Sequence, residues 1–236
     1  MSATPGIRLL ESVEDAVAAS EVLAEVWGGD RSGMPANLLR AMSHAGEYTA
    51  GLFIGDRMVG ASVAFFAEPA ARSLHSHITG VLAEHRGRGL GTLLKQHQRE
   101  WALARGVGRI TWTFDPLVAR NAHLNLTVLG THAVEYLVDH YGVMDDGVNR
   151  RDESDRILVS WELAAPAART PDEADVVAAV AVPDDIEAVR RDAPADAVRW
   201  RREVRDELVA HLAAGRVIAG FDSRRGYLLV RPSPSR

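Results

Sequence analysis

Apolar residues recur along the chain at two different spacings, and the spacing changes from segment to segment. Some segments are apolar at every second residue, which is typical of a half-buried β-strand. Others are apolar at every third or fourth residue, which is typical of an amphipathic helix. The two kinds of segment alternate repeatedly, and this alternation predicts a fold of mixed α/β or α+β class.

The predicted elements follow one another in a definite order, and glycine and proline residues separate them. We expect strands at 7–10, 48–54, 58–66, 74–82, 109–114, 132–138 and 157–163, and helices at 13–27, 34–44, 90–105 and 117–129. Ser12 and Asp15 form an N-cap signature for the first helix, and Gly28 closes it. The helix that begins at residue 90 is expected to bury Leu90, Leu94, His97, Trp101 and Ala104.

The C-terminal quarter of the sequence differs in composition from the rest. Residues 164–175 are rich in Ala, Pro, Asp and Glu, which is typical of a linker. Beyond it we expect a strand at 176–182, one or two helices within 184–215 and a hairpin at 217–230. So short a segment buries only a marginal core alone. We therefore predict a main domain over 1–163 and an extension over 176–236 that docks on the main domain or on the partner subunit of a homodimer.

Composition and charge exclude several classes of protein. The chain has no cysteine, so disulfides, thiolate metal sites and cysteine nucleophiles are ruled out. Its 27 Lys and Arg against 32 Asp and Glu give no electrostatic reason to expect nucleic acid or an anionic membrane as the main partner. The first residues lack the pattern of a secretory signal, and no apolar run approaches the roughly 20 residues of a membrane span. We therefore expect a soluble, cytoplasmic protein.

A glycine-rich loop follows the predicted strand at 74–82 and leads into the next helix. From Arg86 to Gly91 it reads Arg-Gly-Arg-Gly-Leu-Gly. In such a loop backbone N–H groups converge on an anion, and the helix N-terminus adds positive potential. The glycine spacing differs from that of dinucleotide-binding and P-loop motifs, and Arg86 and Arg88 suit a diphosphate or a phosphorylated ribose. The other interpretation is a glycine-rich turn with two solvated arginines.

At this loop the sequence resembles the GNAT superfamily of acyl-CoA-dependent N-acyltransferases. Arg86-x-x-Gly89-x-Gly91 matches the family's Gln/Arg-x-x-Gly-x-Gly/Ala motif, in its place after the fourth strand and before the third helix. The order of elements over 7–163 also matches. The resemblance implies a GNAT-like α+β fold, with a central mixed, mostly antiparallel sheet flanked by helices. The tail after residue 163 resembles that of a predicted-acyltransferase subgroup, some of whose members look like amino-acid N-succinyltransferases.

The resemblance also implies a cofactor, acetyl-CoA or another acyl-CoA, and the residues that hold it. The loop would bind the diphosphate of coenzyme A. The backbone around Thr79 to Leu82 would pair with the pantetheine arm, and an N–H near Val81 would polarise the thioester carbonyl. Asn121 looks like the family's asparagine that steadies this arm, although a surface helix residue is an equal interpretation. The expected cofactor-binding residues are Thr79, Val81, Arg86, Gly87, Arg88, Gly89, Leu90, Gly91, Thr92 and Asn121.

Acyl transfer to an amine benefits from a general base, because the amine must lose a proton before it attacks. Histidine is the natural candidate near neutral pH. His75 and His77 lie on one face of the fourth predicted strand. By counting back from the loop, His75 matches the position of a catalytic carboxylate in several family members. Two alternatives stay open: half-buried structural histidines, and a metal enzyme built on His75-x-His77. A third metal ligand is missing at a telling spacing, so we expect no metal.

The general acid for the departing thiolate is where the sequence departs from the family's pattern. Family members often have a tyrosine at the place that Leu126 takes here. Tyr136 or Tyr141 can substitute from the next segment, and Tyr141 is our candidate. A coenzyme A thiolate can also leave without strong proton assistance. The departure keeps another hypothesis open, a binding module that holds acyl-CoA without turning it over.

Asp115, at the end of a strand, and Asn125, on the following helix, are the candidate substrate-binding residues. Asp115 can hold the ammonium group of the acceptor, although Asp before Pro is also common turn chemistry. We expect the acceptor to be a small-molecule amine or an amino acid, and the donor to carry an acetyl or a succinyl group. The sequence does not choose between these donors.

Overall fold

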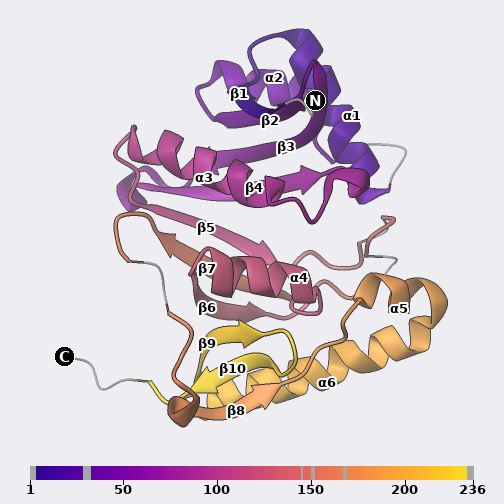
Figure 1. The fold of residues 1–236 in the computed structure, drawn as a ribbon, viewed down its shortest axis with the longest axis vertical. Helices are drawn as coiled ribbons and strands as arrows, with labels where there is room; N and C mark the ends of the chain where they lie inside the picture. Colours follow the sequence, from indigo (N-terminus) through magenta and orange to yellow (C-terminus); the bar gives the residue numbers. More distant parts are fainter. Residues whose placement is uncertain (1–3, 29–32, 145, 150–151, 167–168, 233–236) are drawn as a thin grey trace. The chain divides into compact units, whose positions relative to one another are not determined.

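The computed structural model describes residues 4–28, 33–144, 146–149, 152–166 and 169–232. The chain forms two compact units, Met1–Thr111 and Trp112–Arg236, and each is described by itself (Figure 1). The division falls within one strand, whereas the sequence composition predicts a boundary after residue 163. The predicted linker over 164–175 includes residues 167–168, which lie outside the described residues.

The first unit is built on a mostly antiparallel sheet with the strand order β1-β2-β3-β4-β5. Neighbouring strands are antiparallel, except that β5 runs parallel to β4. The strands are β1 (Pro5–Leu9), β2 (Tyr48–Ile54), β3 (Arg57–Phe66), β4 (Ser73–Val81) and β5 (Arg109–Phe114), which continues into the second unit. The predicted mixed α/β class, with a large and mostly antiparallel sheet flanked by helices, is confirmed.

Three helices pack on this sheet, namely α1 (Val13–Trp27), α2 (Ala36–His44) and α3 (Leu90–Leu103). The N-cap prediction for α1 is confirmed, because Ser12 Oγ accepts a hydrogen bond from the Asp15 N–H at 3.1 Å. Gly28 ends α1 with a left-handed φ of 63°. The helices and strands bury a common apolar core that includes Leu10, Leu23, Leu39, Leu52, Val63 and Leu94.

In its described residues, the second unit combines a strand pair, a separate small sheet and five helical segments. Strands β6 (His132–Leu137) and β7 (Arg156–Glu162) form an antiparallel pair. A three-stranded antiparallel sheet has the order β8-β10-β9. Its strands are β8 (Val176–Val180), β9 (Val217–Asp222) and β10 (Gly226–Val230). The helical segments are α4 (Ala119–Ala122), a π-helical turn at His123–Val128, a 3-10 turn at Glu173–Asp175, α5 (Ile186–Asp192) and α6 (Pro194–Ala213).

The C-terminal segment packs on residues 112–163 of the same chain, within the second unit. The buried Tyr227 OH donates to the Pro116 carbonyl at 2.7 Å, and Thr127 Oγ1 donates to the Phe221 carbonyl at 2.9 Å. Burial of a phenol requires such a partner. These contacts join the end of β5 and the π-helical turn to the small sheet.

Two details of the helices differ from the prediction. The helix expected at 117–129 is a short α-helix that widens into the π-helical turn, where the Leu129 N–H donates to Leu124 O five residues earlier. In α3 the buried positions include the polar Lys95 and Gln98, whereas His97 is half-buried and Ala104 is exposed. The predicted face of α3 was therefore wrong at these two positions.

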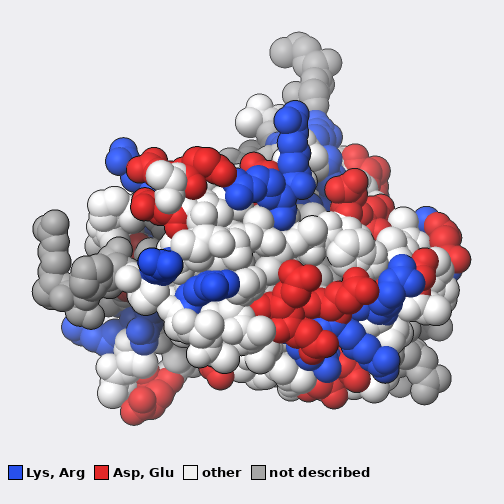
Figure 2. Space-filling view, turned by 90° about the horizontal axis from the view of Figure 1, so that it is seen from below, with Lys and Arg blue, Asp and Glu red and all other residues white. Residues whose placement is uncertain are grey.

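Surface composition bears on the expected partners. None of the helices in the described part of the chain is long and apolar enough to span a membrane. On the face shown in Figure 2, acidic and basic side chains lie close to one another in mixed groups. This face therefore lacks the continuous basic surface that nucleic acid binding requires.

Candidate active site

The loop that opens α3 presents a row of backbone N–H groups. Gly87 and Gly89 have left-handed φ angles of 73° and 76°, which glycine adopts without strain. The N–H groups of residues 87–92 have no hydrogen-bond acceptor among the described residues, as is usual for the first turn of a helix. A Cβ atom added at Gly87, Gly89 or Gly91 would meet nothing within 4 Å. The loop is thus an open cradle for an anion rather than a turn filled by the protein's own side chains.

Two exposed arginines flank this cradle. Arg86 Nε donates to the Val81 carbonyl at 3.2 Å and so ties the loop to the end of β4. Arg88 Nη1 lies 3.2 Å from His85 Nδ1. Their positive charges add to the potential of the α3 N-terminus. The combination of N–H groups and guanidinium groups suits a diphosphate.

One edge of β4 has no strand partner over most of its length. β4 pairs with β5 only at Ser73–His75, whereas it pairs with β3 from Leu74 to Val81. Along residues 76–81 of the described structure, no strand bonds to the second edge. Gly80 allows α1 to pack closely here, because a Cβ would lie 2.7 Å from Trp27. The predicted pantetheine-binding residues Thr79 and Val81 lie in this open stretch of strand.

A β-bulge in β4 lies at one of the candidate bases. The pairing with β3 shifts between Ala64↔Ser76 and Val63↔Ile78, so His77 is the extra residue. Bulges often redirect a side chain near an active site. The ring of His77 lies 6.5 Å from that of His75, and both rings lie within 6 Å of the exposed Phe65 ring. Burial lowers the pKa of His77, which favours the neutral form that a general base needs.

A buried polar layer lies between α3 and the strands that carry these residues. Lys95 Nζ donates to Ser76 Oγ at 2.7 Å, and Ser62 Oγ lies 2.8 Å from Thr79 Oγ1. Gln98 Nε2 donates to Ser62 Oγ at 3.3 Å. Burial lowers the pKa of Lys95 to about 7. Sequence reasoning missed Lys95, since a lysine on a helix is usually solvated.

The remaining predicted residues lie in the second unit. The Tyr141 hydroxyl is 3.0 Å from Thr113 Oγ1, and its side chain is half exposed. Tyr136 instead donates to Asp155 Oδ2 at 2.7 Å, and its burial together with Asp155 raises its pKa. Asn125 is buried and accepts a hydrogen bond from Trp112 Nε1 at 3.2 Å, while Asn121 is half-buried. Of the two tyrosines, Tyr141 is therefore the better placed to exchange a proton with a ligand.

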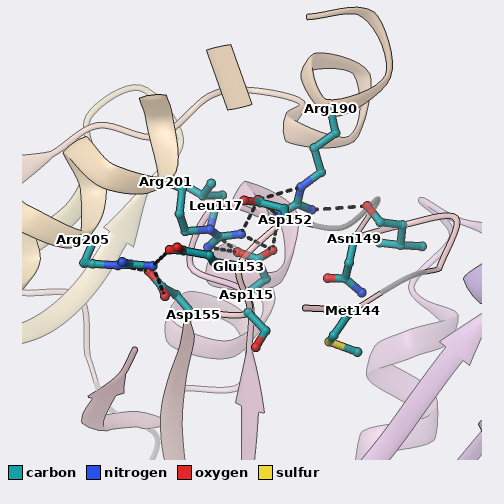
Figure 3. Close-up of polar contacts among 12 residues, drawn as sticks. Asp115, Leu117, Met144, Asn149, Asp152, Glu153, Asp155, Arg190, Arg201 and Arg205 are labelled. Atoms are coloured by element: carbon teal, nitrogen blue, oxygen red, sulfur yellow. Dashed lines mark hydrogen bonds and ion pairs between the residues drawn. The ribbon is translucent and has the colours of Figure 1, made fainter. Parts of the chain in front are cut away.

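Asp115 lies within a buried cluster of ion pairs that sequence reasoning did not predict (Figure 3). Its two carboxylate oxygens accept hydrogen bonds from Arg201 at 2.8 and 3.0 Å and from Arg190 at 2.6 Å. Asp152 accepts from the same two arginines at 2.9 and 3.0 Å. An acceptor ammonium at Asp115 would have to compete with both guanidinium groups.

The spacing along α6 is the signal that could have revealed this cluster. The buried positions of α6 are Ala197, Arg201, Val204 and Leu208, which recur every three or four residues. Arg201 therefore occupies a core position of an amphipathic helix. Arg201 is 1% exposed, although a run of arginines among acidic residues usually marks a solvated helix face.

The metal hypothesis for His75 and His77 finds no support in the geometry. In the part of the chain that the structure describes, no three His, Asp or Glu side chains are grouped to hold a metal ion. A catalytic zinc needs three protein ligands.

Comparisons with known proteins give a family for the segment that carries these features. Residues 16–124, just under half of the chain, match the Acetyltransferase (GNAT) family model, so this segment is similar to the GNAT acetyltransferases. No curated protein matches the chain. The matched segment includes most of α1, the cradle, α3 and both candidate histidines.

Solved structures agree on the fold. The ribosomal-protein-S18-alanine N-acetyltransferase from Escherichia coli matches with a TM-score of 0.56 at 15% identity, over 69% of this chain and 96% of that one. An N-acetyltransferase from Staphylococcus aureus Mu50 matches with a TM-score of 0.55 at 15% identity, over 68% and 99%. An aminoglycoside 6'-acetyltransferase type Ii gives the same TM-score, identity and coverage. These proteins differ in substrate, so the likeness shows the fold alone.

Proposed function

We propose that the protein is an acyl-CoA-dependent N-acyltransferase. It transfers an acetyl or a succinyl group to the amine of a small molecule or an amino acid, by direct attack of the amine on the thioester. The observation that carries this proposal is the open cradle at 86–92, with its N–H groups without acceptors and its two exposed arginines, inside the segment of the GNAT family match.

The cradle and β4 would hold the cofactor. The N–H groups of residues 87–92 and the guanidinium groups of Arg86 and Arg88 supply donors and positive charge for a diphosphate. The open edge of β4 around Thr79 and Val81 offers backbone groups for the amides of the pantetheine arm. When bound, acyl-CoA supplies the activated acyl group.

Backbone N–H groups also supply electrostatic stabilisation. Attack on a thioester builds negative charge on its carbonyl oxygen. A fixed N–H donor near Val81 would meet that charge, and a single donor of this kind is worth about 3 kcal/mol. Holding amine and thioester together supplies a further part of the rate.

His75 and His77 are the proposed proton acceptors. The acceptor arrives as an ammonium ion, and its proton passes to a neutral imidazole before the amine attacks. The lowered pKa of His77 keeps that ring neutral at physiological pH. Tyr141 is the proposed donor of the proton that the departing thiolate takes up, and Asn121 the proposed support of the cofactor arm.

The remaining roles concern the acceptor and the assembly. Asp115 and Asn125 are proposed to bind the acceptor. An acceptor ammonium at Asp115 would compete with the ion pairs that this carboxylate makes with Arg190 and Arg201. The segment 176–236 is proposed to wall off the acceptor or to serve a homodimer contact.

A thiol-release assay tests the proposal. The purified chain is supplied with acetyl-CoA or succinyl-CoA and a panel of amines and amino acids, and free coenzyme A is measured. We expect amine-dependent release with at least one donor. A chain that binds acyl-CoA and releases no thiol with any amine would instead be a binding module. Absence of acyl-CoA binding would refute both functions.

A further inference from the structure

Arg156, the first residue of β7, is a buried cation that has no anionic partner among the described residues. It is 7% exposed. No Asp or Glu oxygen of the described residues lies within ion-pair distance of its guanidinium. A buried charge is costly unless it is paired. Its presence here therefore calls for an explanation.

The contacts of the Arg156 guanidinium are weak on one side. Nη1 donates to the Asp155 carbonyl at 2.8 Å. Nη2 donates to Met144 Sδ at 3.0 Å and to Asn149 Oδ1 at 3.5 Å. A thioether is a weak acceptor, and 3.5 Å is the outer limit of a hydrogen bond. Among the described residues, Nε has no hydrogen-bond acceptor.

Nearby carboxylates are already engaged. Asp115 and Asp152 each accept from both Arg190 and Arg201. Asp155, adjacent to Arg156, turns its carboxylate to Arg205, to the Tyr136 hydroxyl and to the Asp139 N–H. None of them is available to Arg156 without breaking an existing pair.

The surroundings of Arg156 are partly open. The Tyr141 ring lies 5.4 Å from its Cζ, and the Tyr141 side chain is 46% exposed. Met144 is half-buried, and Asn149 is fixed by a 2.7 Å hydrogen bond from its Nδ2 to Asp146 Oδ2. Met144 and Asn149, both labelled in Figure 3, are the two side chains that accept from Arg156 Nη2. A small group that displaces Met144 Sδ would reach Nη2 and Nε together.

We infer that Arg156, with Tyr141 and Asn149 beside it, forms a binding site for the carboxylate of a ligand. The Nε–H and one Nη2–H of a guanidinium point in the same direction and match the two oxygens of a carboxylate. The choice of ligand rests on the proposed function, which offers two sources of a carboxylate. One is an amino-acid acceptor, and the other is the terminal carboxylate of a succinyl donor.

Calorimetric binding to the full chain separates these sources. One arm compares amino acids with their amides, and the other compares succinyl-CoA with butyryl-CoA, which lacks the terminal carboxylate. We expect the acid to bind about 10- to 100-fold more tightly than its neutral partner in one arm, as for a hydrogen bond to a charged group. Arg156→Gln should abolish that preference, and Arg156→Lys should keep part of it. Arg120→Gln, which removes an exposed arginine paired with Glu187, is the control.

A second pair of variants keeps the test valid if Arg156→Gln does not fold. Met144→Glu places a carboxylate beside Arg156, and Met144→Gln is its uncharged match. We expect Met144→Glu to melt about 2–4 °C above Met144→Gln, the shift of a modest gain in a chain of this size, and to lose the preference for acids.

Each outcome is decisive. The inference is overturned if the wild type prefers the acid in neither arm, if the preference survives in Arg156→Gln, or if the two Met144 variants behave alike. Equal binding of succinyl-CoA and butyryl-CoA with no acid preference for amino acids, alongside normal thiol release, would overturn the carboxylate site and leave the proposed function intact. An acid preference among amino acids without any acyl-CoA binding would refute the proposed function and leave the carboxylate site intact.

Discussion

Neutralising Asp115 is the perturbation whose effect on stability the structure defines best. The carboxylate is 7% exposed and receives two hydrogen bonds from Arg201, one from Arg190 and one from the Leu117 N–H. Asp115→Asn keeps the shape of the side chain and removes its charge. It leaves Arg190 and Arg201 facing the single carboxylate of Asp152.

The expected cost follows from this burial. Removing one partner of a buried ion pair typically destabilises a protein by about 3–5 kcal/mol, because the other charge stays buried and uncompensated. The pair between Arg120 and Glu187 provides a control, since it also reaches α5 with a 2.6 Å contact but has side chains that are 50% and 26% exposed. Arg120→Gln should cost about 0–1 kcal/mol.

Urea unfolding followed by circular dichroism measures both costs. A loss for Asp115→Asn within about 1 kcal/mol of that for Arg120→Gln would refute the reasoning. If Asp115 held the acceptor ammonium instead, Asp115→Asn would raise the KM for the amine and leave the unfolding transition in place.

The pH dependence of stability provides a second readout of the same cluster. Burial alone would raise the pKa of Asp115, but Arg201 and Arg190 outweigh it and hold the pKa well below its ordinary value of 3.8. The stabilisation is therefore complete above pH 3.8 and is lost as the pH falls below it. Asp115→Asn should remove this part of the acid sensitivity, while Arg120→Gln should retain it.

The remaining predictions concern the two histidines and Lys95. His75→Ala should lower kcat/KM by about a hundredfold if His75 is the base. Unchanged kinetics would show that another residue is the base. If His77 is the base, the acidic limb of kcat/KM should lie below pH 6.5, because burial lowers its pKa from that value; a limb that persists in His77→Gln would contradict this. Lys95 titrates near pH 7 when folded and near 10.5 when unfolded, so the unfolded chain binds more protons between these values and stability should rise with pH across this window. Lys95→Met should flatten that rise, and equal slopes in both proteins would show that Lys95 does not cause it.

The sequence predicted most of the fold because each strand and helix carries its own local pattern. The apolar run at 58–66, the alternation in 109–114 and the N-cap at Ser12 are properties of adjacent residues, and the structure has these elements where we expect them. The cradle was predictable for the same reason, since its glycines, arginines and helix start are contiguous.

The rest depended on contacts between residues far apart in the chain. Asp115 forms ion pairs with Arg190 and Arg201, which lie 75 and 86 residues further along the chain. No local sequence pattern predicts such a pair. Lys95 was missed because its burial depends on how α3 lies on β4, where Ser76 receives its ammonium group. The bulge at His77 likewise follows from the register with β3, which a single strand does not encode.

Binding of acetyl-CoA to a single glycine variant tests the central claim most directly. Gly89→Asp places bulk and negative charge in the cradle. Gly215→Asp is the matched control, because Gly215 has the same φ of 76° and equal free space but follows α6. By calorimetry, the wild type and Gly215→Asp should bind acetyl-CoA with similar affinity, and Gly89→Asp should show no binding. Equal binding by all three proteins would contradict the account.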